Sequence, residues 1–303
     1  MEKFKLWISA FRLRTLPLSV SGIIIGSALA YYNGAFELSI FILAILTTLS
    51  LQILSNLAND YGDGVKGTDH EDRIGPERAI QSGKISENEM FHAIRLNILI
   101  VIFLVFATVF TAFGIQNFIY AIVFFGIGGL AVYAAIKYTI GGSAYGYRAL
   151  GDLMVFIFFG IVSVLGSYFL FMKQIDHVTI LPACIVGLLS VGVLNLNNMR
   201  DIETDKISKK ITVAVKLGWK RAKTYHLFLI GTSILLGVLY AVLYFRFYIN
   251  LIFLLAMIPL CIHLAKIIRT DQPEQLDSQL KILALSTFAF SILLAIGHVY
   301  NLI

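Results

Sequence analysis

The chain has 303 residues, of which 58% are hydrophobic and only 14% are charged, and its formal net charge is +6. This composition excludes a water-soluble globular domain and is typical of a polytopic membrane protein. The positive charge does not call for a nucleic-acid partner, because the cytoplasmic loops of membrane proteins are enriched in Lys and Arg.

The N-terminal segment, residues 1–19, alternates basic and apolar side chains before the first long apolar run. It lacks the small-residue cleavage site after a short apolar core that marks a removable signal peptide. We therefore expect a retained amphipathic segment that lies at the membrane surface.

Nine apolar stretches follow, and each is long enough, at about 20 residues, to cross a bilayer as a helix. Their approximate bounds are 14–32, 38–57, 92–113, 118–136, 152–172, 178–199, 224–245, 248–268 and 280–302. No low-complexity tract, Pro-rich linker or second soluble segment separates them. The sequence therefore predicts an all-α polytopic membrane protein with nine transmembrane helices, in which residues 1–303 form a single domain.

The distribution of basic residues predicts the orientation of these helices. If the N-terminus is cytoplasmic, 22 of the 24 Lys and Arg residues lie in cytoplasmic segments, and only Lys173 and Arg246 lie on the other side. This asymmetry is the positive-inside pattern, and one missed span would scramble it. Because the chain shows no transit peptide, we expect a bacterial cell membrane, with the N-terminus and the long polar loops in the cytoplasm.

The second apolar stretch runs into a polar segment, residues 56–86, which begins N-L-A-N-D-Y-G-D-G-V-K-G-T-D and continues H-E-D-R-I-G-P-E-R. This segment holds six of the chain's 18 carboxylates and four of its 24 Lys and Arg residues. Asn56 and Asp60 are four residues apart and therefore lie on one face of a helix, and Asp63 follows within one turn. These three residues are called the first motif below.

A second polar segment begins after the sixth apolar stretch and reads L-N-N-M-R-D-I-E-T-D-K-I-S-K-K from Leu196. The second motif, Asn197, Asp201 and Asp205, has the same four-residue spacing and starts 141 residues after the first. The spacing predicts that its side chains lie along one face of a helix, at the same cytoplasmic end of the bundle.

Two carboxylates on one helical face repel each other unless a cation lies between them. Oxygen ligands in this number suit Mg²⁺, which keeps part of its coordination shell for water and substrate phosphates. Basic residues near both motifs suit a diphosphate, namely Arg73, Arg78, Lys209 and Lys210. The pattern therefore predicts ionisation of an allylic diphosphate, because metal ions and basic side chains stabilise the departing pyrophosphate. Ordinary solvated loop acids are the plainer interpretation.

The loop after the fourth apolar stretch, K-Y-T-I-G-G-S-A-Y-G-Y-R-A-L-G-D, lies on the same side and is rich in Tyr and Gly. We call residues 138–150 the third loop. Together with the two motif segments it is expected to form a cytoplasmic-side active-site cap over the helices. Asp152 begins the next span, where a carboxylate either favours the helix N-terminus or contacts a substrate.

Taken together, N-D-Y-G-D-G-V-K-G-T-D-H-E-D-R-I-G-P-E-R, N-N-M-R-D-I-E-T-D and nine spans resemble the UbiA superfamily of intramembrane aromatic prenyltransferases. Within it, G-V-K-G-T-D, R-I-G-P and Y-G-Y-R-A-L-G-D resemble the MenA-type 1,4-dihydroxy-2-naphthoate polyprenyltransferases, over nearly the whole chain. The resemblance implies transfer of a polyprenyl group from polyprenyl diphosphate to the naphthoate, with loss of CO₂ and pyrophosphate, giving demethylmenaquinone in menaquinone biosynthesis. It also implies Mg²⁺ as cofactor and membrane lipid as surroundings.

The resemblance further implies the residues of the site. The four aspartates of the two motifs are expected to be catalytic, and with Asn56 and Asn197 they are expected to hold the metal. The superfamily pattern has a further Asp at position 67, where this chain has Gly67, and the nearest acid offered as a ligand is Asp69. Substrate contacts are expected from Asn56, Asn59, Lys66, Arg73, Arg78, Tyr138, Arg148, Asn197, Arg200, Lys209 and Lys210.

Other acceptors occur in the same superfamily, among them 4-hydroxybenzoate, homogentisate, haem and a glycerol phosphate. A secondary transporter is the alternative from a different class, because acids inside membranes often mark ion pathways. Against a transporter, the acids gather at one membrane face rather than in mid-helix, and the two halves show no inverted hydropathy repeat.

Overall fold

The computed structural model describes residues 2–67, 78–244 and 246–300, and every regular element in these ranges is helical. In chain order the α-helices are α1 (Glu2–Phe11), α2 (Leu16–Tyr32), α3 (Leu38–Val65), α4 (Glu87–Phe113), α5 (Phe118–Lys137), α6 (Gly151–Val155), α7 (Ser167–Met172), α8 (Ile180–Arg200), α9 (Ile202–Ile207), α10 (Val213–Tyr244), α11 (Met257–Arg269) and α12 (Leu276–Val299). Short segments join them: η1 (Leu13–Thr15), η2 (Tyr145–Tyr147), the π-helical η3 (Phe156–Gly166), η4 (His177–Thr179), η5 (Tyr248–Ala256) and η6 (Pro273–Gln275).

Nine helical segments within the described ranges are long and apolar enough to cross a membrane, which confirms the predicted number. Some spans combine consecutive elements: α6, η3 and α7 form one of them, and η5 continues into α11. Several helix ends lie beyond the predicted bounds. In particular, α3 continues to Val65, where the prediction ends at 57, and α10 begins at Val213, where the prediction begins at 224. Both extensions carry polar residues that hydropathy alone assigns to loops. α10 is also kinked at Gly218, whose φ of 71° is in the left-handed region that favours glycine.

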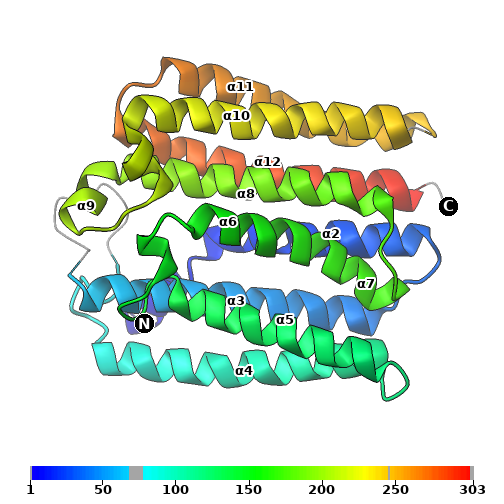
Figure 1. Ribbon diagram of the computed structural model, residues 1–303, viewed down its shortest axis with the longest axis horizontal. Coiled ribbons are helices and arrows are strands. Elements are labelled where there is room, and N and C mark those ends of the chain that lie inside the picture. The colour runs from blue at the N-terminus through cyan, green and yellow to red at the C-terminus, as the bar shows by residue number, and fades with distance from the viewer. Residues whose placement is uncertain (1, 68–77, 245, 301–303) are drawn as a thin grey trace.

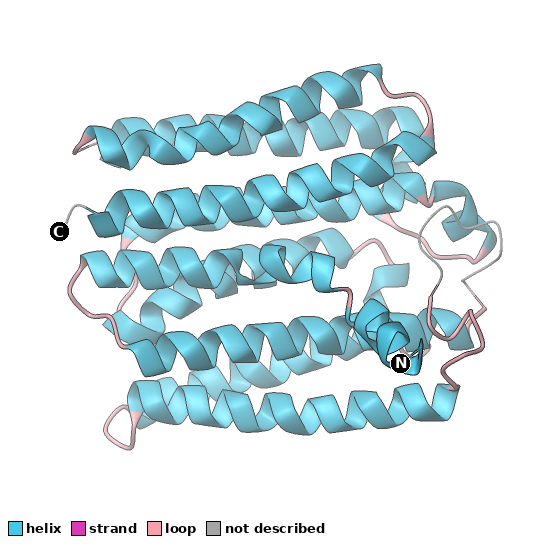
Figure 2. Cartoon of the chain, turned by 180° about the vertical axis from the view of Figure 1, so that it is seen from behind, coloured by secondary structure: helices cyan, strands magenta, loops and turns pink. Residues whose placement is uncertain are grey.

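The long helices lie side by side, with their axes along the long dimension of the molecule (Figure 1). α9, α1 and the loop between α5 and α6 gather at one end, and the last turn of α12 lies at the other. The view from behind shows the same layout (Figure 2). α8 packs against α10, η3 and α12, so the helix that carries the second motif has neighbours on several sides.

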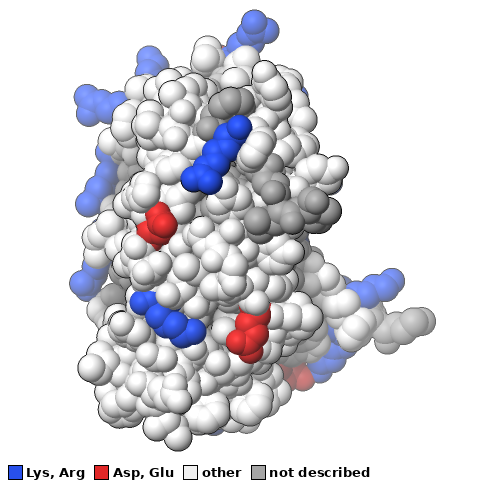
Figure 3. Space-filling model, turned by 90° about the vertical axis from the view of Figure 1, so that its right-hand side faces the viewer, with Lys and Arg blue, Asp and Glu red and all other residues white. Residues whose placement is uncertain are grey.

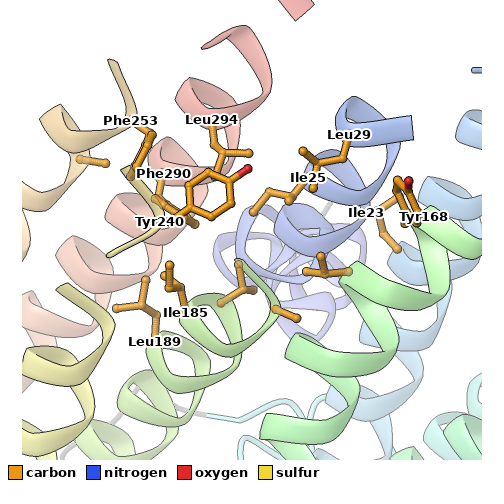
Figure 4. Close-up of a cluster of buried hydrophobic side chains, with 14 of the residues drawn as sticks. Ile23, Ile25, Leu29, Tyr168, Ile185, Leu189, Tyr240, Phe253, Phe290 and Leu294 are labelled. Atoms are coloured by element: carbon orange, nitrogen blue, oxygen red, sulfur yellow. The ribbon is translucent and has the colours of Figure 1, made fainter. Parts of the chain in front are cut away.

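The larger hydrophobic core lies among α2, α8, α12 and the segments packed on them. Ile25, Leu29, Ile185, Leu189 and Phe290 are fully buried members of this core, and they come from three different helices (Figure 4). Burial of apolar side chains from helices far apart in sequence holds the bundle together.

The outward faces of α4 and α5 are strongly apolar. Phe103 and Ile119 have exposed fractions of 68% and 74%. Extended apolar surface of this kind is expected of helices that face lipid. The end of the molecule opposite α9 shows few charged side chains among mostly uncharged ones (Figure 3).

A second, smaller core joins α1 to α3 and α4. Leu54, Leu57 and Met90 are buried in it, and Trp7 and Phe11 of α1 pack against them. The sequence predicts an amphipathic segment at the membrane surface, and the structure shows what covers its apolar side. Positions 6, 7, 10 and 11 fall on one side of the helix, and this side packs on α3 and α4.

Close packing requires glycine where η3 meets α8. A Cβ atom at Gly160 would lie 2.5 Å from the carbonyl oxygen of Ala183 and 2.7 Å from the Cα of Gly187. Both are backbone atoms, which move less easily than the end of a side chain. We therefore expect Gly160→Ala to lower the free energy of unfolding by about 1–3 kcal/mol, seen as a lower midpoint of thermal unfolding in detergent.

Gly231→Ala is the control for this substitution. Gly231 lies within α10, and a Cβ atom there would meet nothing within 4 Å. Alanine is also the better helix former, so the unfolding midpoint should stay the same or rise. Equal losses in the two variants would show that the close approach at Gly160 is not the cause.

Candidate active site

The first motif occupies the last turns of α3. Asn56 is buried, and its Nδ2 donates to the carbonyl oxygen of Phe11 at 2.9 Å and to Thr15 Oγ1 at 3.2 Å. Its Oδ1 accepts a hydrogen bond from Gln52 Nε2 at 3.2 Å. Asn56 therefore ties the connection between α1 and α2 to α3, and so places the N-terminal segment beside the motif.

Asp60 and Asp63 are almost fully buried and share one cation, Arg78. Arg78 Nη1 donates to Asp63 Oδ2 at 2.6 Å, and Arg78 Nε lies 4.0 Å from Asp60 Oδ1. Asp60 Oδ2 also accepts a hydrogen bond from the backbone N–H of Ala79 at 3.3 Å. A guanidinium therefore supplies the positive charge that two neighbouring buried carboxylates need.

The third loop lies over the first motif. The Tyr147 hydroxyl donates to Asp63 Oδ1 at 2.8 Å, and Lys66 Nζ donates to the carbonyl oxygen of Thr139 at 2.6 Å. Thr139 Oγ1 in turn lies 3.3 Å from Asn59 Oδ1. These bonds hold the loop against α3, so it covers this end of the bundle.

The second motif lies where α8 gives way to α9. α8 ends at Arg200, and Asp201 has φ −98° and ψ 14° before α9 begins at Ile202. The predicted single helical face is therefore interrupted at Asp201, although the amide of Asp205 still donates to the Asp201 carbonyl oxygen at 2.8 Å. In a regular helix, the side chains of adjacent residues point in different directions. Because the helix breaks at Asp201, the side chains of Arg200 and Asp201 can meet, and Arg200 Nε donates to Asp201 Oδ1 at 2.8 Å.

Arg200 is the most enclosed cation of the site, with a side chain only 1% exposed. Besides Asp201, its guanidinium donates to Asn197 Oδ1 at 2.8 Å and to Asp277 Oδ1 at 2.7 Å. Asp277 lies on α12, so this cation joins the second motif to a distant helix. A buried guanidinium needs such partners, because an unpaired charge is costly to bury.

Lys210 joins the two motifs. Its Nζ lies 3.5 Å from Asp63 Oδ2 and 3.8 Å from Asp205 Oδ1. The backbone N–H of Lys210 also donates to the Asp205 carbonyl oxygen at 2.8 Å. Lys210 and Asp63 are 147 residues apart in the sequence, and the structure brings them to one place.

A cleft of about 320 Å³ opens between α1, α3 and α8. Its polar lining combines both motifs with the N-terminal segment and consists of Arg12, Arg14, Asp60, Arg78, Asn197 and Arg200, besides Ser9. Guanidinium groups match phosphate oxygens with paired, parallel hydrogen bonds. The cleft therefore combines carboxylate and amide oxygens with four guanidinium groups, which suits a diphosphate that arrives with a metal ion.

Some of the predicted residues lie elsewhere. Arg148 and Lys209 have exposed side chains. Arg148 contributes through its backbone, which forms an isolated bridge with Ile211 and so joins the third loop to the loop after α9. Asp69 and Arg73 lie outside the described residues.

Tyr138 is half-buried at the start of the third loop, with its ring 5.4 Å from that of Tyr145. Loss of hydration raises the pKa of Tyr138 well above its usual value, and the nearby carboxylate of Asp152 adds to the effect. The phenol therefore stays protonated at neutral pH and is available as a hydrogen-bond donor.

Three residues of this site are not predicted from the sequence. Arg12 and Arg14 stand there only among the cytoplasmic basic residues, although both line the cleft. Tyr147 belongs to the Tyr-rich third loop without being singled out, and its hydroxyl donates to Asp63. The clustering of Tyr residues in a short polar loop is the only local signal, and it does not say which hydroxyl turns toward α3.

Within the described ranges, no three His, Cys, Asp or Glu side chains lie close enough together to hold a metal ion. Basic side chains stand beside the carboxylates instead. Asp60 nevertheless fits a cation, because its Oδ1 is buried and makes no hydrogen bond to any group in the described part of the chain, while Asp60 lines the cleft. Carboxylate and amide oxygens are the ligands that suit Mg²⁺.

Known proteins resemble this chain in sequence and in fold. The sequence matches the UbiA prenyltransferase family over residues 19–293. The 1,4-dihydroxy-2-naphthoate octaprenyltransferase of Haemophilus influenzae is 40% identical over 300 residues, which are 98% of this chain and 96% of that protein. The protein of the same name from Escherichia coli is 43% identical over 235 residues, which cover 77% of this chain and 75% of that one.

Among solved structures, that of a UbiA homolog from Archaeoglobus fulgidus bound to GPP and Mg²⁺ matches with a TM-score of 0.63. The match covers 94% of this chain and 99% of that one, at 14% identity, and it shows a common fold. With nine helical segments of membrane-spanning length among its described residues, a residue of each motif at one cleft and a family match over residues 19–293, this chain belongs to the UbiA prenyltransferase family.

Proposed function

We propose that this protein is a Mg²⁺-dependent 1,4-dihydroxy-2-naphthoate polyprenyltransferase of menaquinone biosynthesis, embedded in a bacterial cell membrane. It joins the polyprenyl group of a polyprenyl diphosphate to the naphthoate and releases CO₂ and pyrophosphate, giving demethylmenaquinol, the reduced form of demethylmenaquinone. The observation that carries the proposal is the meeting of two Asp motifs at a guanidinium-lined cleft, in a chain whose relatives bear this name.

The cleft is the proposed site of the donor diphosphate. Arg78 and Arg200 now neutralise motif carboxylates, and they are the groups that would bind phosphate oxygens when the diphosphate enters. The metal would be held by Asp60, Asp63, Asp201 and Asp205, with the side-chain oxygens of Asn56 and Asn197. When bound, Mg²⁺ supplies positive charge where negative charge develops on the leaving pyrophosphate.

The surroundings of the cleft serve the carbon chemistry. The third loop and α1 cover the motifs and would keep water away from the allylic cation. The apolar helices below offer a lipid-like path for the polyprenyl tail. The acceptor's ring carbon that bears the carboxylate would attack the allylic carbon, and breaking the bond to CO₂ would restore the aromatic ring.

The same proposal gives the protein an orientation. The N-terminus, both motif segments and the third loop would face the cytoplasm, because 22 of the 24 Lys and Arg residues then lie on that side. Water-soluble naphthoate would reach the cleft from the cytoplasm, while the polyprenyl diphosphate would enter from the membrane.

A product assay on membranes that contain the protein tests the function. A polyprenyl diphosphate and carboxyl-labelled dihydroxynaphthoate are supplied with and without Mg²⁺, and labelled CO₂ is measured together with the lipid product. We expect Mg²⁺-dependent release of CO₂ in equal amount to a prenylated naphthoquinol. Product with 4-hydroxybenzoate but not with the naphthoate would leave the family intact and refute the proposed acceptor.

A further inference from the structure

Two ammonium groups lie beside the ring of Tyr147, beneath the third loop. Lys66 Nζ is 4.0 Å from the ring centroid, and Lys210 Nζ is 5.6 Å from it. Both distances are in the range of a cation–π contact. Lys66, Lys210 and Tyr147 are called the lysine cluster below. Its residues come from the end of α3, the third loop and the loop after α9.

Among the described residues, two carboxylates lie beside the lysine cluster, Asp63 and Asp205, and both contact Lys210. Asp63 is the nearer one, and it also pairs with Arg78 at 2.6 Å. Lys66 Nζ donates to the uncharged carbonyl of Thr139 at 2.6 Å. In the part of the chain that the structure describes, no carboxylate lies within the 4.0 Å ion-pair distance of Lys66.

Partial burial lowers the pKa of Lys66 from its usual value, the charge of Asp63 raises it, and the charges of Lys210 and Lys137 lower it. Lys66 lies against the same ring as Lys210 and has no carboxylate within ion-pair distance among the described residues. Such a cation attracts an anion.

The lysine cluster adjoins the cleft that suits the diphosphate but does not line it. The cleft is lined by guanidinium groups together with Asp60 and Asn197, and none of the three residues of the lysine cluster is among its lining residues. The ion pair between Arg78 and Asp63 lies between them, because Arg78 lines the cleft and Asp63 contacts Tyr147 and Lys210.

The two places differ in chemistry as well as in position. A guanidinium is a planar fork that matches phosphate oxygens, whereas an ammonium group is a compact point charge. The proposed reaction has two anionic reactants, a diphosphate and an aromatic carboxylate. The arginines of the cleft suit the first, and the two lysines beside an aromatic ring suit the second.

We infer that Lys66 and Lys210 bind the carboxylate of the aromatic acceptor, with Tyr147 beside its ring, and thereby set the acceptor's position relative to the donor. The inference rests on the proposed function, because it needs an acceptor that carries a carboxylate. The ammonium groups hold this carboxylate until the new C–C bond forms. The bond to the carboxylate carbon then breaks, its electron pair restores the aromatic ring, and CO₂ leaves.

Lys66→Gln is the variant that tests this assignment, because Lys210 also contacts Asp63. Binding to purified protein in detergent is measured anaerobically for 1,4-dihydroxy-2-naphthoate and for 1,4-dihydroxynaphthalene, which lacks only the carboxyl group. We expect Lys66→Gln to weaken naphthoate binding roughly 10- to 100-fold and to leave binding of the diol unchanged. Lys66→Arg, which keeps the charge, should retain most of the preference for the naphthoate.

Lys206→Gln is the matched control, because Lys206 pairs with Glu203 at 2.8 Å on the exposed side of α9. It should bind both compounds as the wild type does. Thermal unfolding of each variant shows whether it is folded, and the KM for polyprenyl diphosphate should change less than about twofold in Lys66→Gln.

Two further outcomes separate the inference from the proposed function. If Lys66→Gln weakens binding of the naphthoate and the diol equally, or raises the KM of the donor instead, the carboxylate assignment is wrong although the enzyme still converts the naphthoate. If the wild type binds polyprenyl diphosphate but neither binds nor converts the naphthoate, the proposed function fails, and the inference fails with it.

Discussion

Asp60→Asn and Asp201→Asn are each expected to reduce prenyl transfer by about 10³-fold or more, while the protein still folds and inserts into membranes. Asparagine keeps the size of the side chain and removes one negative charge. Asp60 lines the cleft, and its buried Oδ1 has no hydrogen bond to a described group. Asp201 pairs with Arg200, and both Arg200 and the neighbouring Asn197 line the cleft. If Asp60 and Asp201 hold the metal as proposed, each substitution removes a ligand atom that a metal–diphosphate complex needs.

Initial rates at increasing Mg²⁺ concentrations measure this effect. We expect both variants to need more Mg²⁺ than the wild type and to stay slow at saturation. Asp271→Asn is the control, because the Asp271 side chain is 88% exposed and pairs with Lys223 away from the cleft. Near-normal rates in both motif variants would contradict the proposed metal site.

Arg78→Met is expected to lower the free energy of unfolding of the metal-free protein by about 3 kcal/mol, and to impair turnover as well. The Arg78 side chain is only 9% exposed, and its Nη1 bonds both to Asp63 Oδ2 at 2.6 Å and to the Asn59 carbonyl oxygen at 3.2 Å. Removing this cation leaves the buried carboxylate of Asp63 with less compensating charge. Lys210, at 3.5 Å, only partly replaces it.

Thermal unfolding in detergent, with and without Mg²⁺ and a prenyl diphosphate, tests this prediction. If Asp63 holds the metal, Mg²⁺ should raise the unfolding midpoint of Arg78→Met more than that of the wild type, because the metal replaces the missing charge. Arg95→Met is the matched control, since Arg95 is exposed on α4 and contacts Phe91 and His92. An equal Mg²⁺ effect in all three proteins would show that Asp63 is not a ligand.

The membrane class and the number of spans follow from local properties of the sequence. Hydropathy reports whether 20 consecutive residues tolerate lipid, and it needs no knowledge of neighbouring helices. Because hydropathy ignores neighbouring helices, it does not predict one end of α3 and one end of α10. α3 continues through polar residues to Val65, and α10 begins before its apolar run, at Val213. Contacts with other segments decide where a polar turn stays helical.

The two motifs were also evident from the sequence, because Asp and Asn at a spacing of four residues lie on one helical face. Which basic residues join them was not evident. Lys209 and Lys210 are adjacent and chemically alike, yet Lys209 is exposed with a φ of 56° whereas Lys210 is buried beside Asp63. The backbone turn at Lys209 makes this difference, and the pattern of residue types does not encode it.

Composition, hydropathy and helical spacing are properties of short segments, so the sequence predicts nine membrane spans and two acidic motifs, and the described residues confirm the nine spans. How the site is closed depends on the packing of the helices. This packing seats α1 on α3, so that Arg12 and Arg14 line the cleft, and it brings Tyr147 to Asp63 across 84 residues of sequence. Such contacts depend on how whole helices pack, because packing sets the distance between side chains that no local pattern connects.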